Sequence, residues 1–212
     1  MHRARVITMA IALLVWLAAP VAAPVAAPAA SSPPKVRPYT GIGILTFSNP
    51  SPAEEPLYPL YEDPGLARIG LLAPGAFPGN AWIFGEQFRH APVIVTGRKD
   101  AWLKVVYDDA GREGWLKPGT AGSYQPWEQF LKSRMVTALP GIQKKYLQLY
   151  HQPGGVPLAP LTARQAFRVV RLEQDWALVV PPDQGTLGWL RWRDEDGRLL
   201  FGIVAAEMAA LP

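Results

Sequence analysis

An internal repeat constrains the fold of this chain more than any other feature. The interval from Trp102 to Trp115 is the same as the interval from Trp176 to Trp189. In each copy a short apolar run leads into a turn, and the second tryptophan stands in a Gly-Trp-Leu triplet. An equal spacing across a turn predicts that both copies form a hairpin of the same register.

Each copy opens with Leu-Tyr before a Pro-Gly turn, at residues 60–65 and 149–154. The interval from this tyrosine to the first tryptophan is longer in the first copy, from Tyr61 to Trp102, than in the second, from Tyr150 to Trp176. The first copy therefore carries about 15 extra residues, which we assign to the aromatic, Gly/Pro-rich segment 74–88. This insertion either packs over the first copy or forms a binding surface.

The order Leu-Tyr, Pro-Gly, Asp-x-Trp-Leu-Lys-Val and Gly-x-x-Gly-Trp-Leu resembles the bacterial SH3-like (SH3b) domain. The residues that carry the resemblance are Leu60-Tyr61, Asp100–Val105 and Gly111–Leu116 in the first copy, and Leu149-Tyr150, Asp175-Trp176 and Gly185–Leu190 in the second. It covers residues 57–118 and 146–205, with Leu178 standing where the first copy has Lys104. The resemblance implies a mainly β chain of two small SH3-like β-barrels, and short strands with closely spaced turns agree with that fold.

The segment between the copies has a helical pattern. Pro126 suits a first helical turn, and apolar residues recur at three- and four-residue steps up to Leu139. We expect one amphipathic helix over 126–139, within a connecting segment 124–141.

Residues 1–29 are typical of a secretory signal peptide, with Arg3, Arg5, an apolar run over 7–19 and an Ala-x-Ala site. The run is shorter than the roughly 20 residues that span a bilayer, so we expect export to the periplasm or cell envelope and no membrane span after cleavage. Residues 30–56 follow as a Pro-rich tether with one short strand at 42–47. The chain beyond residue 29 has 19 Lys and Arg against 17 Asp and Glu, a net charge of +2, and no dense basic stripe. This argues against a nucleic-acid partner.

The chain has no cysteine and only three histidines, which excludes disulfides, Cys-ligated zinc and a thiol nucleophile. His90 and His151 stand outside any catalytic or metal-binding motif. The acidic run 194–197 lacks the twelfth-position ligand of a calcium loop and is predicted to be a solvated turn. We therefore expect no enzymatic activity, no cofactor and no metal.

Alternation along the strand 102–107 places Trp102 and Lys104 on one face. Lysine is rarely buried, so this face is the wetter one, and Trp102 either lies in a groove there or closes one end of the barrel. Trp176 has apolar neighbours on its face and is predicted to be more buried, while a core or rim position is favoured for Trp115 and Trp189. The candidate ligand-binding residues are Tyr61, Trp102, Lys104, Trp115, Tyr150, Trp176 and Trp189.

The SH3b resemblance implies an exported, non-catalytic module that binds cell-wall peptidoglycan or its stem peptides. The ligand would lie in aromatic grooves, with Lys104, Arg98 and Lys99 nearby. The alternative is an adaptor or accessory subunit for another exported protein, with the aromatic segment 77–88 and the outer faces of the helix as its interface.

Overall fold

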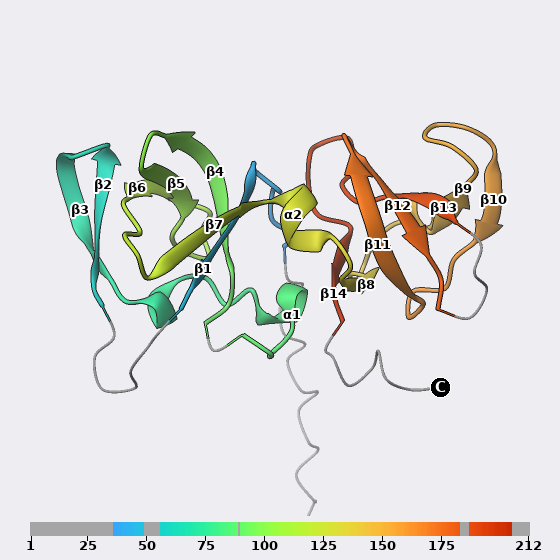
Figure 1. Cartoon of the computed structure of the whole chain (residues 1–212), viewed down its shortest axis with the longest axis horizontal. Helices are drawn as coiled ribbons and strands as arrows, with labels where there is room; N and C mark the ends of the chain where they lie inside the picture. The colour runs from blue at the N-terminus through green and yellow to red at the C-terminus, as the bar shows by residue number, and fades with distance from the viewer. Residues whose placement is uncertain (1–35, 49–55, 89, 183–186, 205–212) are drawn as a thin grey trace, which may run out of the picture. The chain divides into compact units, whose positions relative to one another are not determined.

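The structure is a computed structural model and describes residues 36–48, 56–88, 90–182 and 187–204. The chain folds as a mainly β protein with two antiparallel sheets of seven strands each (Figure 1). The predicted signal peptide and parts of the predicted tether lie outside the described residues. In the described part of the chain, no helix is long and apolar enough to cross a membrane.

The first sheet has the strand order β3-β2-β6-β5-β4-β1-β7. Its strands are β1 (Gly43–Phe47), β2 (Tyr58–Asp63), β3 (Leu66–Leu72), β4 (Val93–Lys99), β5 (Trp102–Val106), β6 (Glu113–Leu116) and β7 (Gly122–Pro126). The predicted short strand at 42–47 is β1, and it lies inside the sheet between β4 and β7 rather than in a tether. The first sheet thus extends beyond the predicted range 57–118 at both ends.

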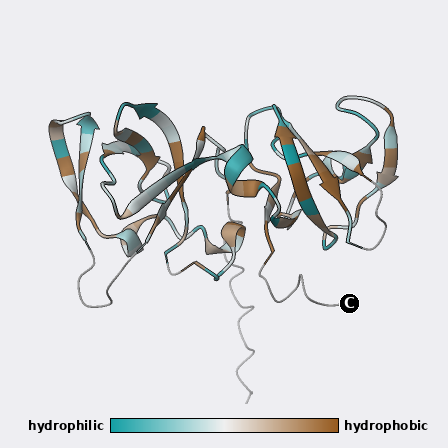
Figure 2. Cartoon of the chain, in the orientation of Figure 1, coloured by the Kyte–Doolittle hydropathy of each residue, from teal (hydrophilic) through white to brown (hydrophobic). Residues whose placement is uncertain are grey.

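The second sheet has the equivalent order β10-β9-β13-β12-β11-β8-β14. Its strands are β8 (Met135–Ala138), β9 (Gln148–Tyr150), β10 (Pro157–Pro160), β11 (Ala166–Glu173), β12 (Trp176–Val180), β13 (Gly188–Arg191) and β14 (Phe201–Ile203). In Figure 2, brown and teal bands alternate along β11, whose Phe167 and Val169 are buried and whose Arg168 is exposed.

The predicted common register of the two copies is confirmed. In the β4–β5 hairpin the pairing shifts between Val95 and Gly97, and in the β11–β12 hairpin it shifts at the equivalent place, between Val169 and Arg171. The opening tyrosine of each copy also lies opposite the Gly-Trp-Leu tryptophan in both sheets.

Closed barrels are not formed. In the described part of the chain each sheet keeps two edge strands, β3 and β7 in the first and β10 and β14 in the second. The reason is that β7 pairs with β1, and β14 with β8, so neither strand joins its sheet to the opposite edge.

The glycine of each Gly-Trp-Leu triplet makes room for the leucine that opens the same copy. A Cβ atom on Gly114 would lie 2.8 Å from the Cγ of Leu60, and one on Gly188 would lie 2.5 Å from the Cγ of Leu149. Both distances are far below an ordinary carbon–carbon contact. The absence of a side chain at these glycines therefore allows the close approach of the leucine, and it explains why the two motifs occur together.

The predicted helix over 126–139 is wrong beyond Leu131. Helix α2 contains only Trp127–Leu131, and Ser133 then takes a φ of 64°, in the left-handed region that a right-handed helix cannot pass through. Residues 135–138 form β8 instead, which pairs with β11 and β14. Val136 and Thr137 are β-branched, and backbone pairing on both sides outweighs the helical spacing of the apolar residues.

The insertion of the first copy packs into a core rather than forming an open surface. Segment 73–92 connects β3 to β4, whereas the much shorter segment 161–165 connects β10 to β11, so the first connection is longer by the length predicted from the sequence. The insertion contains the 3-10 helix η1 (Pro74–Ala76) and the helix α1 (Ala81–Phe84). Phe84 is 1% exposed, and its ring lies 6.2 Å from that of Trp127 and 5.9 Å from that of Phe130.

One hydrophobic cluster joins residues of both sheets. It includes Phe167 and Val179 of the second sheet, Phe130 of α2, and Ile44 and Ile94 of the first sheet. The opposite face of β1 and β4 belongs to a separate core, made of Leu45, Leu60, Phe77, Val93, Val95, Leu103, Val105 and Leu116. The two copies are therefore not simply connected by a linker, because their strands and the insertion share buried contacts.

Candidate functional site

Four side chains of the first copy share one face of its sheet: Tyr61, Trp102, Lys104 and Trp115. Trp115 lies opposite Lys104 on β5 and opposite Tyr61 on β2, and directly paired residues project from the same face. Trp102 joins them because it stands two residues from Lys104 on the same strand. The rings of Tyr61 and Trp102 meet edge to face, with centroids 5.3 Å apart. All four are half-buried, and we call them the first aromatic strip.

The predicted alternation along β5 is confirmed. Leu103 and Val105 are 3% and 0% exposed, whereas Trp102 and Lys104 on the other face are half-buried. The aromatic strip is thus the outer, water-facing side of a strand whose inner side fills the core of the first sheet.

Lys104 is not a free cation. Its Nζ lies 2.7 Å from Oε2 of Glu113, the neighbour of Gly114 in the strand that carries Trp115. The hydrogen bond from Lys104 holds the pKa of Glu113 below its usual value, with a smaller contribution from Thr96, and partial burial opposes it. The strip therefore presents rings beside an ion pair that is neutral as a whole.

The second copy repeats the aromatic pair. The rings of Tyr150 and Trp176 meet at 5.1 Å and 84°, and Trp189 lies opposite both Tyr150 and Leu178. Trp176 is half-buried, like Trp102, rather than buried as the sequence predicts. We call Tyr150, Trp176 and Trp189 the second aromatic strip.

The two strips differ in how far they are covered. The guanidinium of Arg171 lies 5.2 Å from the ring centroid of Trp189, which is only 8% exposed. The pairing register puts Gly97 in the place of Arg171, and a Cβ atom on Gly97 would lie 3.7 Å from the indole of Trp115. Trp115 therefore stays half-buried because the residue beside it has no side chain. The first strip is the more open of the two.

A hollow of about 250 Å³ lies at one end of the first copy, and no residue of the strip lines it. It is lined by Arg98, Asp100, Ala101, Leu103, Lys117, Pro118, Gly119, Gly122 and Tyr124. These residues come from the β4–β5 hairpin, from the β6–β7 connection and from β7. The hollow was not predicted from the sequence, because three segments that are separate along the chain form it. The adjacent cations Arg98 and Lys99 were the only feature of the sequence that pointed to it.

The walls of the hollow include two cations, Arg98 and Lys117, and one tyrosine, Tyr124. Arg98 donates from its Nε to the carbonyl oxygen of Asp100 at 3.3 Å, and its guanidinium lies 5.4 Å from the ring centroid of Tyr124. Partial burial raises the pKa of Tyr124, and the charge of Arg98 opposes this rise. The residues predicted to bind ligand do not line the hollow, so the first copy carries two separate surface features.

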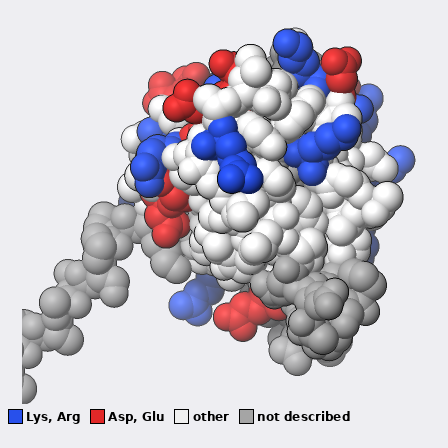
Figure 3. Space-filling view, turned by 90° about the vertical axis from the view of Figure 1, so that its left-hand side faces the viewer, with Lys and Arg blue, Asp and Glu red and all other residues white. Residues whose placement is uncertain are grey.

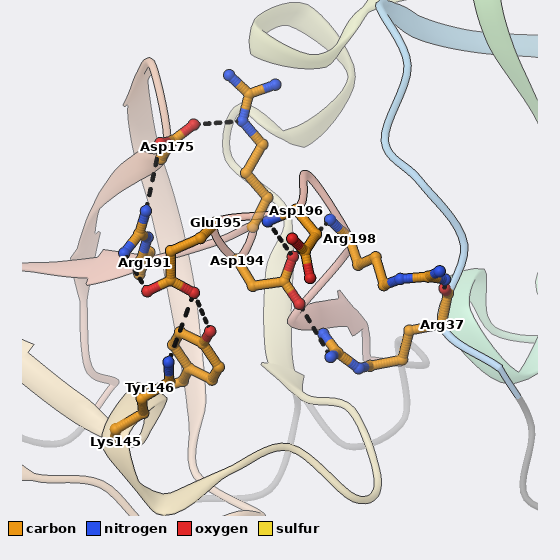
Figure 4. Close-up of polar contacts among 10 residues, drawn as sticks. Arg37, Lys145, Tyr146, Asp175, Arg191, Asp194, Glu195, Asp196 and Arg198 are labelled. Atoms are coloured by element: carbon orange, nitrogen blue, oxygen red, sulfur yellow. Dashed lines mark hydrogen bonds and ion pairs between the residues drawn. The ribbon is translucent and has the colours of Figure 1, made fainter.

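A polar network occupies the matching end of the second copy (Figure 4). Glu195 accepts a hydrogen bond from the hydroxyl of Tyr146 and pairs with Arg191 at 2.9 Å. The bond from Tyr146, helped by Arg191 and Lys145, lowers the pKa of Glu195 to about 2. The carboxylate of Asp175 pairs with Arg191 at 3.5 Å and also with Arg193.

The acidic run 194–197 is not the fully solvated turn that the sequence predicts. Asp194 is 6% exposed, because Arg37 and the backbone N–H groups of Asp196 and Arg198 all donate to its carboxylate. Within the described ranges, no group of three His, Cys, Asp or Glu side chains is placed to hold a metal ion.

Comparison with known proteins gives no family assignment. No protein-family model matches the chain, and no curated protein matches it. Among solved structures the chain is similar to NlpC2 from Trichomonas vaginalis, with 11% identity, a TM-score of 0.32, and coverage of 76% of this chain and 48% of the other. It is also similar to NlpC1 from the same organism, with 14% identity, a TM-score of 0.30, and coverage of 79% and 51%. The chain spans about half the length of these proteins.

Proposed function

We propose that this chain is an exported, non-catalytic binding protein whose two copies are SH3b-like domains that bind cell-wall peptidoglycan or its stem peptides. The first aromatic strip is the main contact surface, and the second strip is a weaker one. The observation that carries the proposal is the open Tyr61–Trp102 pair beside Trp115, because half-exposed rings on a rigid sheet suit a peptide backbone or a sugar face.

The duplication supports a shared binding role. The Tyr-Trp contact recurs in both copies with almost the same ring distance and angle, although many surrounding residues differ. These rings lie on the outer face of each sheet and are only half-buried, so core packing by itself does not account for them. Two such strips on one chain would raise the avidity for a repetitive polymer.

The test is co-sedimentation of the purified protein with isolated peptidoglycan sacculi. Trp102→Ala is expected to raise the apparent Kd about tenfold, because it removes a central aromatic contact. Trp176→Ala is expected to have a smaller effect. Lys132→Ala, at an exposed position after α2, is the matched control and should bind like the parent.

Folding of each variant is checked by circular dichroism and urea unfolding. No pelleting of the parent at any salt concentration would reject wall binding. Equal pelleting of the parent and a folded Trp102→Ala would reject the first aromatic strip as the contact surface.

An adaptor function is the second candidate, but through a different surface from the one the sequence suggests. Segment 77–88 is packed: Phe77 and Phe84 are buried, and Trp82 and Phe88 pack against the core. Edge strand β3, in contrast, exposes Leu66, Ile69 and Leu71. The end of the molecule that carries β2 and β3 has a broad uncharged surface (Figure 3).

The equivalent edge strand β10 contains Pro157 and Pro160, which cannot donate backbone hydrogen bonds, whereas β3 contains no proline. An extended apolar segment of another exported protein, with an acidic residue to face exposed Arg68, would fit beside β3. Ile69→Lys separates the two candidates. If the adaptor function is correct, the Ile69→Lys variant does not bind envelope fragments that retain their proteins, whereas the parent does. The parent also does not bind sacculi from which proteins have been removed.

A further inference from the structure

The two copies differ at the end of the sheet where the hollow lies. Trp176 pairs with Arg191, and Lys117 occupies the matching position after Gly-Trp-Leu in the first copy. Pro118 therefore corresponds to Trp192. Ala101 corresponds to Asp175, because each directly precedes the first tryptophan of its copy.

In the second copy, side chains of the protein itself fill the corresponding end of the sheet. Trp192 is 4% exposed, and its indole Nε1 donates to the carbonyl oxygen of Gln174 at 2.8 Å. Its backbone N–H donates to the carbonyl oxygen of Asp175 at 3.0 Å. The carboxylate of Asp175 pairs with both Arg191 and Arg193. The Trp192 ring and the Asp175 carboxylate thus meet at Arg193, whose guanidinium lies 5.3 Å from the Trp192 ring centroid.

In the first copy both groups are missing. Pro118 supplies neither an indole nor a backbone N–H, and Ala101 has no carboxylate. Lys117 is exposed and makes no ion pair with any residue that the structure describes. The hollow of about 250 Å³ remains, with Arg98 as a second cation and Asp100 as the acidic residue in its lining.

We propose that the hollow binds the C-terminal aromatic residue of a peptide or protein partner. The ring takes the place that Trp192 fills in the second copy, and the terminal carboxylate takes the place of the Asp175 carboxylate, facing Lys117 and Arg98. A C-terminal aromatic residue carries both an aromatic ring and a free carboxylate. The lining of this site shares no residue with the first aromatic strip, so the proposal goes beyond wall binding and does not depend on it.

The test is an NMR titration of the purified protein with N-acetyl-tryptophan, which combines an indole with a free carboxylate. Shifts are expected at the amides of Ala101, Gly119 and Gly122, with a Kd of roughly millimolar order for so small a ligand. N-acetyl-tryptophanamide has the same ring without the charge, and acetate has the charge without the ring. Each is expected to bind about fivefold more weakly or worse.

Two variants probe the cationic wall directly. Ala101→Asp rebuilds the arrangement of Asp175 and Arg191, so an internal carboxylate competes for Lys117 and N-acetyl-tryptophan binding falls at least about fivefold. Lys117→Gln is expected to weaken binding of the acid to the level of the amide. Lys132→Gln is the matched control and leaves binding unchanged.

The proposal fails if the parent gives no shifts at these amides. It also fails if acid and amide bind equally, or if folded Ala101→Asp and Lys117→Gln bind like the parent. Failure of sacculus pelleting leaves these outcomes unaffected, so the titration and the test of wall binding are independent.

Discussion

Arg37 donates from its guanidinium to the buried carboxylate of Asp194 at 2.9 Å, across 157 positions of the chain. Two further hydrogen bonds hold the segment before β1 against the residues that follow β13 of the second sheet. The N–H of Thr40 donates to the carbonyl oxygen of Gly197 at 2.9 Å, and the guanidinium of Arg198 donates to the carbonyl oxygen of Arg37 at 2.7 Å. These contacts hold the residues before β1 against the connection between β13 and β14.

We therefore expect Asp194→Ala to lower the free energy of unfolding by about 2–3 kcal/mol, because it removes a buried acceptor that serves three donors. Asp196→Ala is the control: its carboxylate is exposed and should contribute no more than about 0.5 kcal/mol. Urea unfolding measures both. Equal losses for the two variants would contradict a structural role of the Arg37–Asp194 contact.

Stability should depend on the ionisation of Glu195. Its pKa is about 2 in the folded chain against an ordinary 4.5, so its contribution is complete above about pH 4.5 and is lost as the pH falls towards 2. The side chain is 53% exposed, which limits the effect to less than about 1 kcal/mol. Between pH 4.5 and 2 the parent should lose more stability than Glu195→Gln. Glu62→Gln, at an exposed position on β2, should follow the parent curve.

Gly97→Arg is expected to close the first aromatic strip. The new side chain would cover Trp115 as Arg171 covers Trp189, and acrylamide would quench tryptophan fluorescence less. If the strip binds peptidoglycan, sacculus binding falls severalfold while the fold is kept. Gly97→Ala fits, since its Cβ would lie 3.4 Å from the Cβ of Lys104, and should bind like the parent. Unchanged binding by a folded Gly97→Arg would argue against this contact surface.

Gly202→Ala is expected to destabilise the chain by about 1–3 kcal/mol, because its Cβ would lie 2.5 Å from the carbonyl oxygen of Ile83 in α1. Gly70→Ala on β3 is the matched strand control, as a Cβ there meets no atom within 4 Å. Thermal unfolding compares the two. A Gly202→Ala variant as stable as Gly70→Ala would mean that α1 and β14 are not closely packed.

Local patterns in the sequence were sufficient to predict the repeat and its registers. The equal tryptophan spacing of the two copies places Trp102 and Trp176 at equivalent strand positions, and alternation along β5 identifies the outer face that carries Lys104. Both properties depend only on the two-residue period of a strand and on turn length, which neighbouring residues determine.

Contacts distant in sequence decided the rest. Met135–Ala138 has apolar spacing that fits a helix or a strand, and pairing with β11 and β14 made it a strand. Pro118 stands where the second copy has Trp192, but the hollow forms only where the β4–β5 hairpin, the β6–β7 connection and β7 come together. The exposure of Trp115 likewise depends on Gly97, a residue on another strand. The sequence alone determined which side chains share a strand face, whereas the tertiary structure decided which of them are covered, because covering groups come from other segments of the chain.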